Sequence, residues 1–112
     1  MTDSIIVLTT IDNERSAQRI AGSLVERRQA ACVNIIKSVR SIYRWKEKIH
    51  DDEEVLLIIK TQRSSFEDAR KTIEELHTYD LVDIIAVPVE LADARVLEWM
   101  AGCLRPPEKS SS

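Results

Sequence analysis

The sequence predicts an α+β fold whose elements follow the order β-α-β-β-α-β, with a further helix at the end of the chain. Two observations predict this order. Runs of β-branched and other apolar residues recur four times, as expected of strands. Two stretches among them repeat their apolar residues with the period of a helix. This is the ferredoxin-like arrangement, with two helices on one face of a four-stranded antiparallel sheet.

The first strand and helix are predicted at the start of the chain. Residues 5–11 are apolar without alternation, so we expect both faces of this strand to be buried. Asp12 or Asn13 then caps a helix. The apolar residues that follow recur every three or four positions, which is the pattern of an amphipathic helix. The expected buried stripe is Ala17, Ile20, Ala21, Leu24 and Val25.

Residues 30–61 predict an unusually long two-stranded ribbon. Two apolar runs, at residues 31–36 and 55–59, flank a charged middle, and we expect the chain to reverse at residues 46–48. Strands are typically about 5–6 residues long. A ribbon of this length projects from a small domain and cannot bury both of its faces within its own chain.

A second helix follows the ribbon. Ser64 and Glu67 have the spacing of a capping box at its start, and we expect it to end near His77. The expected buried stripe of this helix is Phe66, Ala69, Ile73 and Leu76.

The last strand and helix complete the order. Residues 83–87 predict a strand, and Pro88 places its end at an edge or a bulge because proline cannot donate to a sheet ladder. Asp93 is the expected cap of the final helix. The residues expected to point inward from this helix are Leu97, Met100, Ala101 and Leu104.

Length and composition describe one acidic domain. The chain has 112 residues and a net charge of −3, and we expect a domain at 1–105 and a flexible tail at 106–112. The sequence has no cluster of Lys and Arg of the kind that binds nucleic acid. No apolar run reaches the roughly 20 residues of a membrane span. Without a secretory-signal pattern, we expect a cytoplasmic protein in which Cys32 and Cys103 are free thiols.

The apolar strands also predict self-association. An antiparallel sheet with helices on one face normally alternates apolar and polar residues, because its other face meets water. Here all four strands carry consecutive apolar residues. Something must cover the second face, and the simplest cover is another copy of the chain. We therefore expect an obligate homo-oligomer.

Short segments spread along the chain carry a family resemblance. They are Thr9-Thr10, Ala30-Ala31-Cys32-Val33-Asn34-Ile35, Ser41-Ile42-Tyr43-Arg44-Trp45, Lys48-Ile49, residues 54–61, His77-Thr78-Tyr79 and Trp99. With them the chain resembles the CutA family of divalent-cation tolerance proteins over about residues 4–105. The resemblance implies a tight homotrimer of ferredoxin-like subunits, similar to the trimer of the nitrogen-regulatory PII signalling proteins.

The chain departs from the family pattern at several positions. Thr78 stands where the family usually has a proline, and Val82-Asp83 replaces a Pro-Glu pair. Thr9 stands where some members carry a cysteine linked to copper. The turn after Trp45 lacks the usual glycine, and Val96 replaces a tyrosine. The fold should survive these changes.

Three residues are candidate metal ligands. Imidazole is a common ligand for Cu(II) and Zn(II), and affinity among divalent first-row ions favours copper. His77 and Asp83 lie six residues apart across a short loop, so both could face one cleft. Cys32 is the candidate soft ligand. The alternative for His77 is a structural role, in which its side chain caps the second helix.

Lys60 is the candidate anion-binding residue. It ends an apolar run, and a lysine there could bind a phosphate or carboxylate. Its alternative role is a strand-end lysine whose stem lies along apolar surface. The family resemblance puts Lys60 near an intersubunit cleft with Tyr79, Tyr43 and Trp45. The last two also suit a role as interface aromatics.

We expect the acidic run at residues 51–54 to be a solvated part of the ribbon rather than a calcium site, because successive strand residues point to opposite faces. No motif of a hydrolase or kinase is present. The family resemblance, with the His77 and Asp83 pair, implies a non-enzymatic homotrimer of divalent-ion tolerance that binds copper weakly and has no organic cofactor. The alternative is a PII-like signalling or scaffold trimer whose intersubunit clefts bind a small anion or a protein partner.

Overall fold

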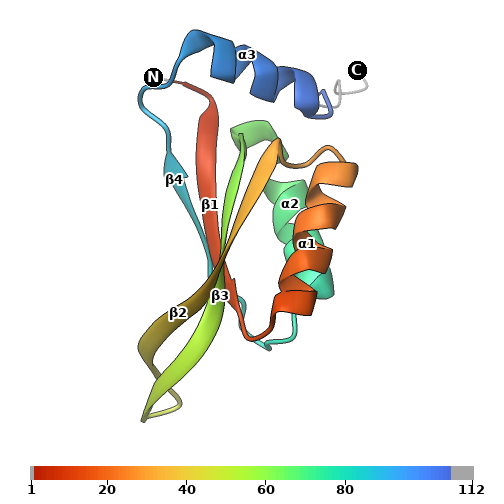
Figure 1. The fold of residues 1–112 in the computed structure, drawn as a ribbon. Helices are drawn as coiled ribbons and strands as arrows, with labels where there is room; N and C mark the ends of the chain where they lie inside the picture. Colours follow the sequence, from red (N-terminus) through yellow and green to blue (C-terminus); the bar gives the residue numbers. More distant parts are fainter. Residues whose placement is uncertain (1, 107–112) are drawn as a thin grey trace, which may run out of the picture.

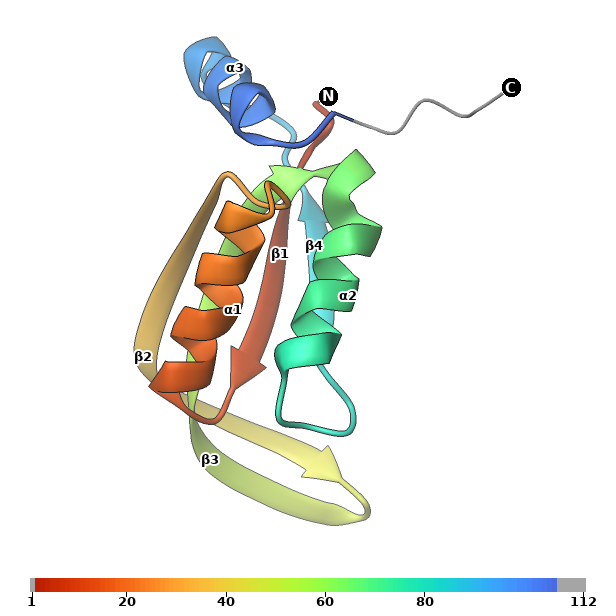
Figure 2. The same cartoon turned by 90° about the vertical axis from the view of Figure 1, so that its right-hand side faces the viewer.

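A computed structural model describes residues 2–106, so the flexible tail expected at 106–112 lies, apart from Pro106, outside the described residues. The elements are β1 (Ser4–Ile11), α1 (Glu14–Glu26), β2 (Cys32–Trp45), β3 (Lys48–Gln62), α2 (Phe66–Leu76), β4 (Ile84–Pro88) and α3 (Ala94–Cys103). The strands form one antiparallel sheet in the order β2-β3-β1-β4. Helices α1 and α2 cover one face of it, and the β2–β3 ribbon extends beyond one end (Figure 1 and Figure 2). The predicted fold is confirmed.

Two of the three predicted helix caps are present. The side chain of Asn13 accepts a hydrogen bond from the Ser16 N–H at 2.7 Å, and Asp93 accepts one from the Arg95 N–H at 2.8 Å. The capping box at the start of α2 was a wrong prediction. The chain enters α2 through a 3-10 turn, Arg63–Ser65, so the cap position shifts to Ser65, which makes no side-chain cap bond.

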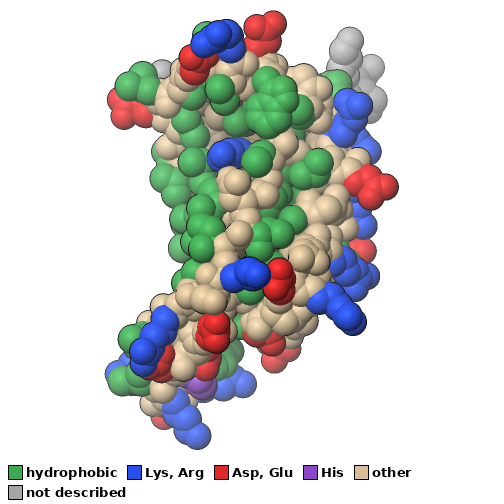
Figure 3. Space-filling model, viewed as in Figure 1, with side chains coloured by type: hydrophobic (Ala, Val, Ile, Leu, Met, Phe, Trp, Pro, Cys, Tyr) green, Lys and Arg blue, Asp and Glu red, His purple; other side chains and the backbone are tan. Residues whose placement is uncertain are grey.

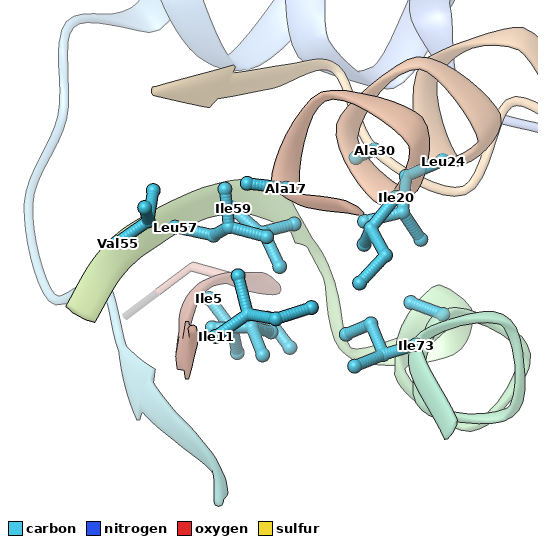
Figure 4. Close-up of a cluster of buried hydrophobic side chains, with 12 residues drawn as sticks. Ile5, Ile11, Ala17, Ile20, Leu24, Ala30, Val55, Leu57, Ile59 and Ile73 are labelled. Atoms are coloured by element: carbon cyan, nitrogen blue, oxygen red, sulfur yellow. The ribbon is translucent and has the colours of Figure 1, made fainter. Parts of the chain in front are cut away.

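The main core lies between the sheet and the helices α1 and α2. In Figure 4, Ile20 and Leu24 of α1 and Ile73 of α2 lie among strand residues such as Leu57, and all four are fully buried. Val25 was wrongly placed in this stripe, because its side chain is 46% exposed. Each residue step turns about 100° around a helix, so Val25 faces away from the side that Leu24 buries.

Helix α3 packs through a second, smaller cluster. This cluster consists of Ala31, Met100 and Leu104, with Cys103 packed against it. Ala101 was predicted to point inward, and this was wrong. It is exposed because it lies one helical step beyond the buried Met100. Among the described helices, none is both long and apolar enough to cross a membrane.

The ribbon is bent near its base and closed by a tight turn. Pairing shifts between Ile36 and Val39 of β2, so two residues of β2 oppose one of β3, and Ser38 in this bulge has a φ of 62°. Bulges of this kind bend a strand and increase its twist. The reversal uses Lys46 and Glu47, with φ of 51° and 66°. Position 48, expected in the turn, is the first residue of β3.

The side of the sheet away from α1 and α2 carries a surface that we call the open face. By strand register its members are Ser4, Ile6, Leu8, Thr10, Cys32, Asn34, Ile36, Leu56, Ile58, Lys60, Gln62, Ile85 and Val87. It is apolar except for Ser4, Thr10, Asn34, Lys60 and Gln62, and Ile85 is 55% exposed. Figure 3 shows hydrophobic side chains gathered along the β4 side of the molecule. In one chain, therefore, Ile6, Leu8 and Thr10 of β1 are only half-buried on the open face, whereas the residues of β1 that face the helices are fully buried.

Candidate functional site

Both ring nitrogens of His77 make hydrogen bonds. Its Nε2 lies 2.7 Å from the carbonyl oxygen of Thr10, and its Nδ1 accepts from the backbone N–H of Tyr79 at 3.0 Å. Because a carbonyl oxygen can only accept, the arrangement requires a neutral ring with its proton on Nε2. His77 is the residue after the last turn of α2. Its side chain thereby ties the end of α2 to β1.

Tyr79 continues this chain of contacts to the ribbon. Its hydroxyl donates to Oε2 of Glu54 at 2.8 Å, and its ring lies 4.7 Å from the ring of His77, centroid to centroid. Glu54 is only 5% exposed. Burial raises the pKa of Tyr79, and the hydrogen bond to Glu54 raises it further.

A second phenol–carboxylate pair lies next to the first. The hydroxyl of Tyr43 donates to Oδ2 of Asp52 at 2.6 Å, and this hydrogen bond raises the pKa of Tyr43 to about 12. The ring of Tyr43 stacks on His50, its partner across the ribbon, at 5.2 Å between centroids. Asp52 and Glu54 are two positions apart on β3, so both tyrosines approach the same side of the strand.

The three candidate metal ligands do not meet within one subunit. Cys32 pairs with Lys60, and Lys60 pairs with Ile6 of β1. Ile6 is four positions from Thr10 along β1, which is about 13 Å at the usual strand rise. His77 contacts Thr10, so the thiol and the imidazole are far apart. Asp83 is exposed in the link before β4. The described part of the chain contains no group of three His, Cys, Asp or Glu side chains that could hold a metal ion.

The candidate anion site is also divided. Tyr43 and Tyr79 bind neighbouring carboxylates at the base of the ribbon, whereas Lys60 lies six positions beyond Glu54 on β3, about 20 Å away. Trp45 ends β2 at the outer end of the ribbon and is 39% exposed. The cleft predicted between subunits stays a prediction.

Glu54 is the site residue that sequence reasoning missed. The acidic run at residues 51–54 was interpreted as solvated ribbon, and this holds for the exposed Asp51, which pairs with Arg40. The carboxylate of Glu54 is instead buried under Tyr79. The sequence signal that could have predicted this burial is the position of Glu54 beside Val55, where the acidic run meets the apolar run.

In chemical terms the cluster around Tyr79 is a set of satisfied hydrogen bonds. The imidazole has both nitrogens in use, and the two phenols donate to two carboxylates. Each carboxylate keeps a second oxygen that can accept a further donor or bind a cation weakly. The arrangement therefore suits binding and positioning.

The whole domain matches a family model. The model described as CutA1 divalent ion tolerance protein matches residues 5–103. The chain belongs to the CutA1 family. The resemblance inferred from the short sequence segments is thereby confirmed.

Individual CutA proteins agree with this assignment. The divalent-cation tolerance protein CutA of Thermus thermophilus is 39% identical over 95 residues, which cover 85% of this chain and 92% of that protein. The chloroplastic CutA 1 of rice is 37% identical over 102 residues, covering 91% of this chain and 58% of the rice protein. The chain thus spans little more than half the length of this plant relative. The crystal structure of CutA from Xylella fastidiosa has a TM-score of 0.90 at 33% identity, covering 93% of this chain and all of that one.

Proposed function

We propose that this CutA1-family chain is a non-enzymatic homotrimer that acts in divalent-ion tolerance and binds Cu(II) weakly. The single observation that carries self-association is the open face, a contiguous apolar surface on the side of the sheet that α1 and α2 leave uncovered. Surfaces of this kind mark protein interfaces. The number of subunits comes from the family resemblance.

The mass of the assembly tests this part of the proposal. We expect the wild-type chain to have three times the subunit mass in light scattering at micromolar concentration. Ile85→Glu puts a charge into the open face and should dissociate the assembly. Val25→Glu, at a similarly exposed apolar residue of α1, is the matched control and should leave the mass unchanged. A wild-type monomer would contradict the proposal.

Weak metal binding agrees with the state of His77. A metal ion needs a free lone pair on the imidazole, and both ring nitrogens are already hydrogen-bonded. Binding must therefore replace one of these bonds, which lowers the affinity. The carboxylate of Asp83 is exposed and can approach an ion held by His77. A soft ligand such as Cys32 could come only from another subunit of the assembly.

Equilibrium dialysis of the metal-free protein against Cu(II) tests this part. We expect saturable binding near one ion per subunit that His77→Ala abolishes and Asp83→Asn weakens. His50→Ala is the matched control, since His50 stacks on Tyr43 away from the Thr10 carbonyl. Binding that is absent, or equal in wild type and His77→Ala, would contradict copper binding through His77.

Lys60 supports a second candidate function, binding of a small anion between subunits. It is the one charged member of the open face, and its strand neighbours there are Cys32 and Ile6. If a second copy covers this face, the ammonium group loses water and needs an acceptor. Phosphate or citrate should then raise the melting temperature of wild type but not of Lys60→Gln. An equal response of both proteins would exclude Lys60 as the anion site.

A further inference from the structure

The outer end of the ribbon exposes apolar side chains on both of its faces. We call residues 42–49 the ribbon tip, because this part projects farthest from the domain (Figure 1 and Figure 2). Ile42 and Ile49 are 68% and 69% exposed, and the strand register places both on one face of the ribbon. Tyr43 and Trp45, each 39% exposed, lie on the other face. A flat protein surface could cover only one of these two faces.

The ribbon tip is basic, although the chain as a whole is acidic. The tip carries Arg44, Lys46 and Lys48 against a single acid, Glu47, whereas the whole chain has a net charge of −3. None of the three cations forms an ion pair within residues 2–106. Lys46 lies instead over the ring of Trp45, 5.7 Å from its centroid. An anionic surface would therefore attract the tip and repel the rest of the chain.

Acidic residues set the inner limit of the ribbon tip. The acidic run at residues 51–54 begins two residues after Ile49 on β3, and its exposed members would be repelled by an anionic surface. From Ile42 to Trp45 the strand advances three steps, which is about 10 Å at the usual rise. Segments that lie in a membrane interface are buried to a depth of about 5–10 Å. The length of the tip thus matches the thickness of this layer.

We infer that the ribbon tip inserts into the headgroup layer of an anionic membrane, while the domain stays outside it. A lipid layer surrounds the segment that enters it, so it covers both faces of the tip at once. The boundary with the acyl chains accepts Ile42 and Ile49. The lipid headgroups attract the three cations. Tryptophan suits the same boundary, because its ring is apolar and its N–H is polar, and this fits the position of Trp45 at the turn.

Sedimentation of the whole protein with lipid vesicles tests the inference. We expect wild type to bind vesicles of phosphatidylcholine and phosphatidylserine, to bind far less to phosphatidylcholine alone, and to be released by high salt. Ile49→Ser should weaken binding on the order of tenfold through lost apolar burial, and Lys48→Gln about fivefold through one lost charge. Val25→Ser on α1 and Lys71→Gln on α2 are the matched controls at exposed positions and should bind like wild type.

Fluorescence quenching by lipids with brominated acyl chains measures the insertion itself. The chain has two tryptophans, Trp45 in the ribbon tip and Trp99 in α3, which lies at the opposite end of the molecule (Figure 1). In Trp99→Phe the remaining Trp45 should be quenched by phosphatidylserine vesicles that contain the brominated lipid. In Trp45→Phe the remaining Trp99 should keep its fluorescence.

Four results would overturn the inference. Wild type that does not sediment with phosphatidylserine vesicles would exclude an anionic membrane as the partner. Binding that Ile49→Ser and Lys48→Gln leave unchanged would place the contact elsewhere on the molecule. Binding without quenching of Trp45 would mean that the tip stays outside the lipid. A lower mass of Ile49→Ser than of wild type in light scattering would assign the tip to a contact between copies of the chain.

Discussion

The hydroxyl of Thr72 on α2 donates to the side-chain carbonyl of Gln29 across 2.6 Å. The same hydroxyl accepts from Arg27 at 3.1 Å, and the backbone carbonyl of Gln29 accepts from Thr61 at 2.7 Å. Thr72 is 2% exposed. These contacts join the end of α1, the middle of α2 and the end of β3 beneath the surface of the domain.

Replacing Thr72 by valine should lower the free energy of unfolding by about 1–2 kcal/mol. The new side chain has nearly the same shape, but the Gln29 carbonyl and the Arg27 guanidinium each lose a partner. Denaturant titration at one fixed protein concentration measures the change. Thr78→Val is the control, because the Thr78 hydroxyl contacts Asp12 at the exposed surface. Equal effects of the two substitutions would contradict the prediction.

Ile73→Ala should lower the free energy of unfolding by about 2–5 kcal/mol, because it leaves a cavity between α2 and the sheet. Ile73 is fully buried. The matched control is Val25→Ala on α1, where 46% of the side chain is exposed and the expected change is below about 1 kcal/mol. A large effect at Val25 would mean that a further surface packs on α1.

Glu47→Gly should raise the free energy of unfolding by about 1 kcal/mol. Glu47 has a φ of 66° in the ribbon turn, a conformation that disfavours residues with a Cβ atom by roughly 1–2 kcal/mol, and part of this gain is offset by the freer unfolded chain. Glu53→Gly, inside β3, should instead destabilise the protein. Thermal unfolding of the two variants side by side decides between these signs.

Alkaline pH should destabilise the protein as Tyr43 ionises. Its hydrogen bond to Asp52 raises the folded-state pKa to about 12, above the value of about 10 for a free tyrosine. A raised pKa means that this contribution to stability is complete below pH 10 and is lost as the pH rises toward 12.

Absorbance at the tyrosinate band measures this titration. In Asp52→Asn the carboxylate charge is gone, so one tyrosine should ionise closer to pH 10 than in wild type. Glu53→Asn is the control, since the hydroxyl of Tyr43 binds Asp52 and not Glu53. Identical tyrosinate titrations of wild type and Asp52→Asn would exclude the hydrogen bond as the cause.

Periodicity and cap residues were enough to predict the element order, because the core stripes and the caps Asn13 and Asp93 are encoded locally. The errors at Val25 and Ala101 arose where an apolar residue lies one step beyond the buried stripe. The bulge at Ser38 has no glycine to signal it. Glu54 and Tyr79 are 25 positions apart, and no local pattern relates two residues that meet only after the chain has folded.

The separate cluster beneath α3 has a consequence for how the molecule opens. Met100 and Leu104 pack on Ala31 and share none of the main core residues. Regions with few buried apolar contacts open at a lower free energy than the rest of a protein. We therefore expect helix α3 to detach at a lower free energy than the sheet, α1 and α2. A protease should then cut first on either side of residues 94–103.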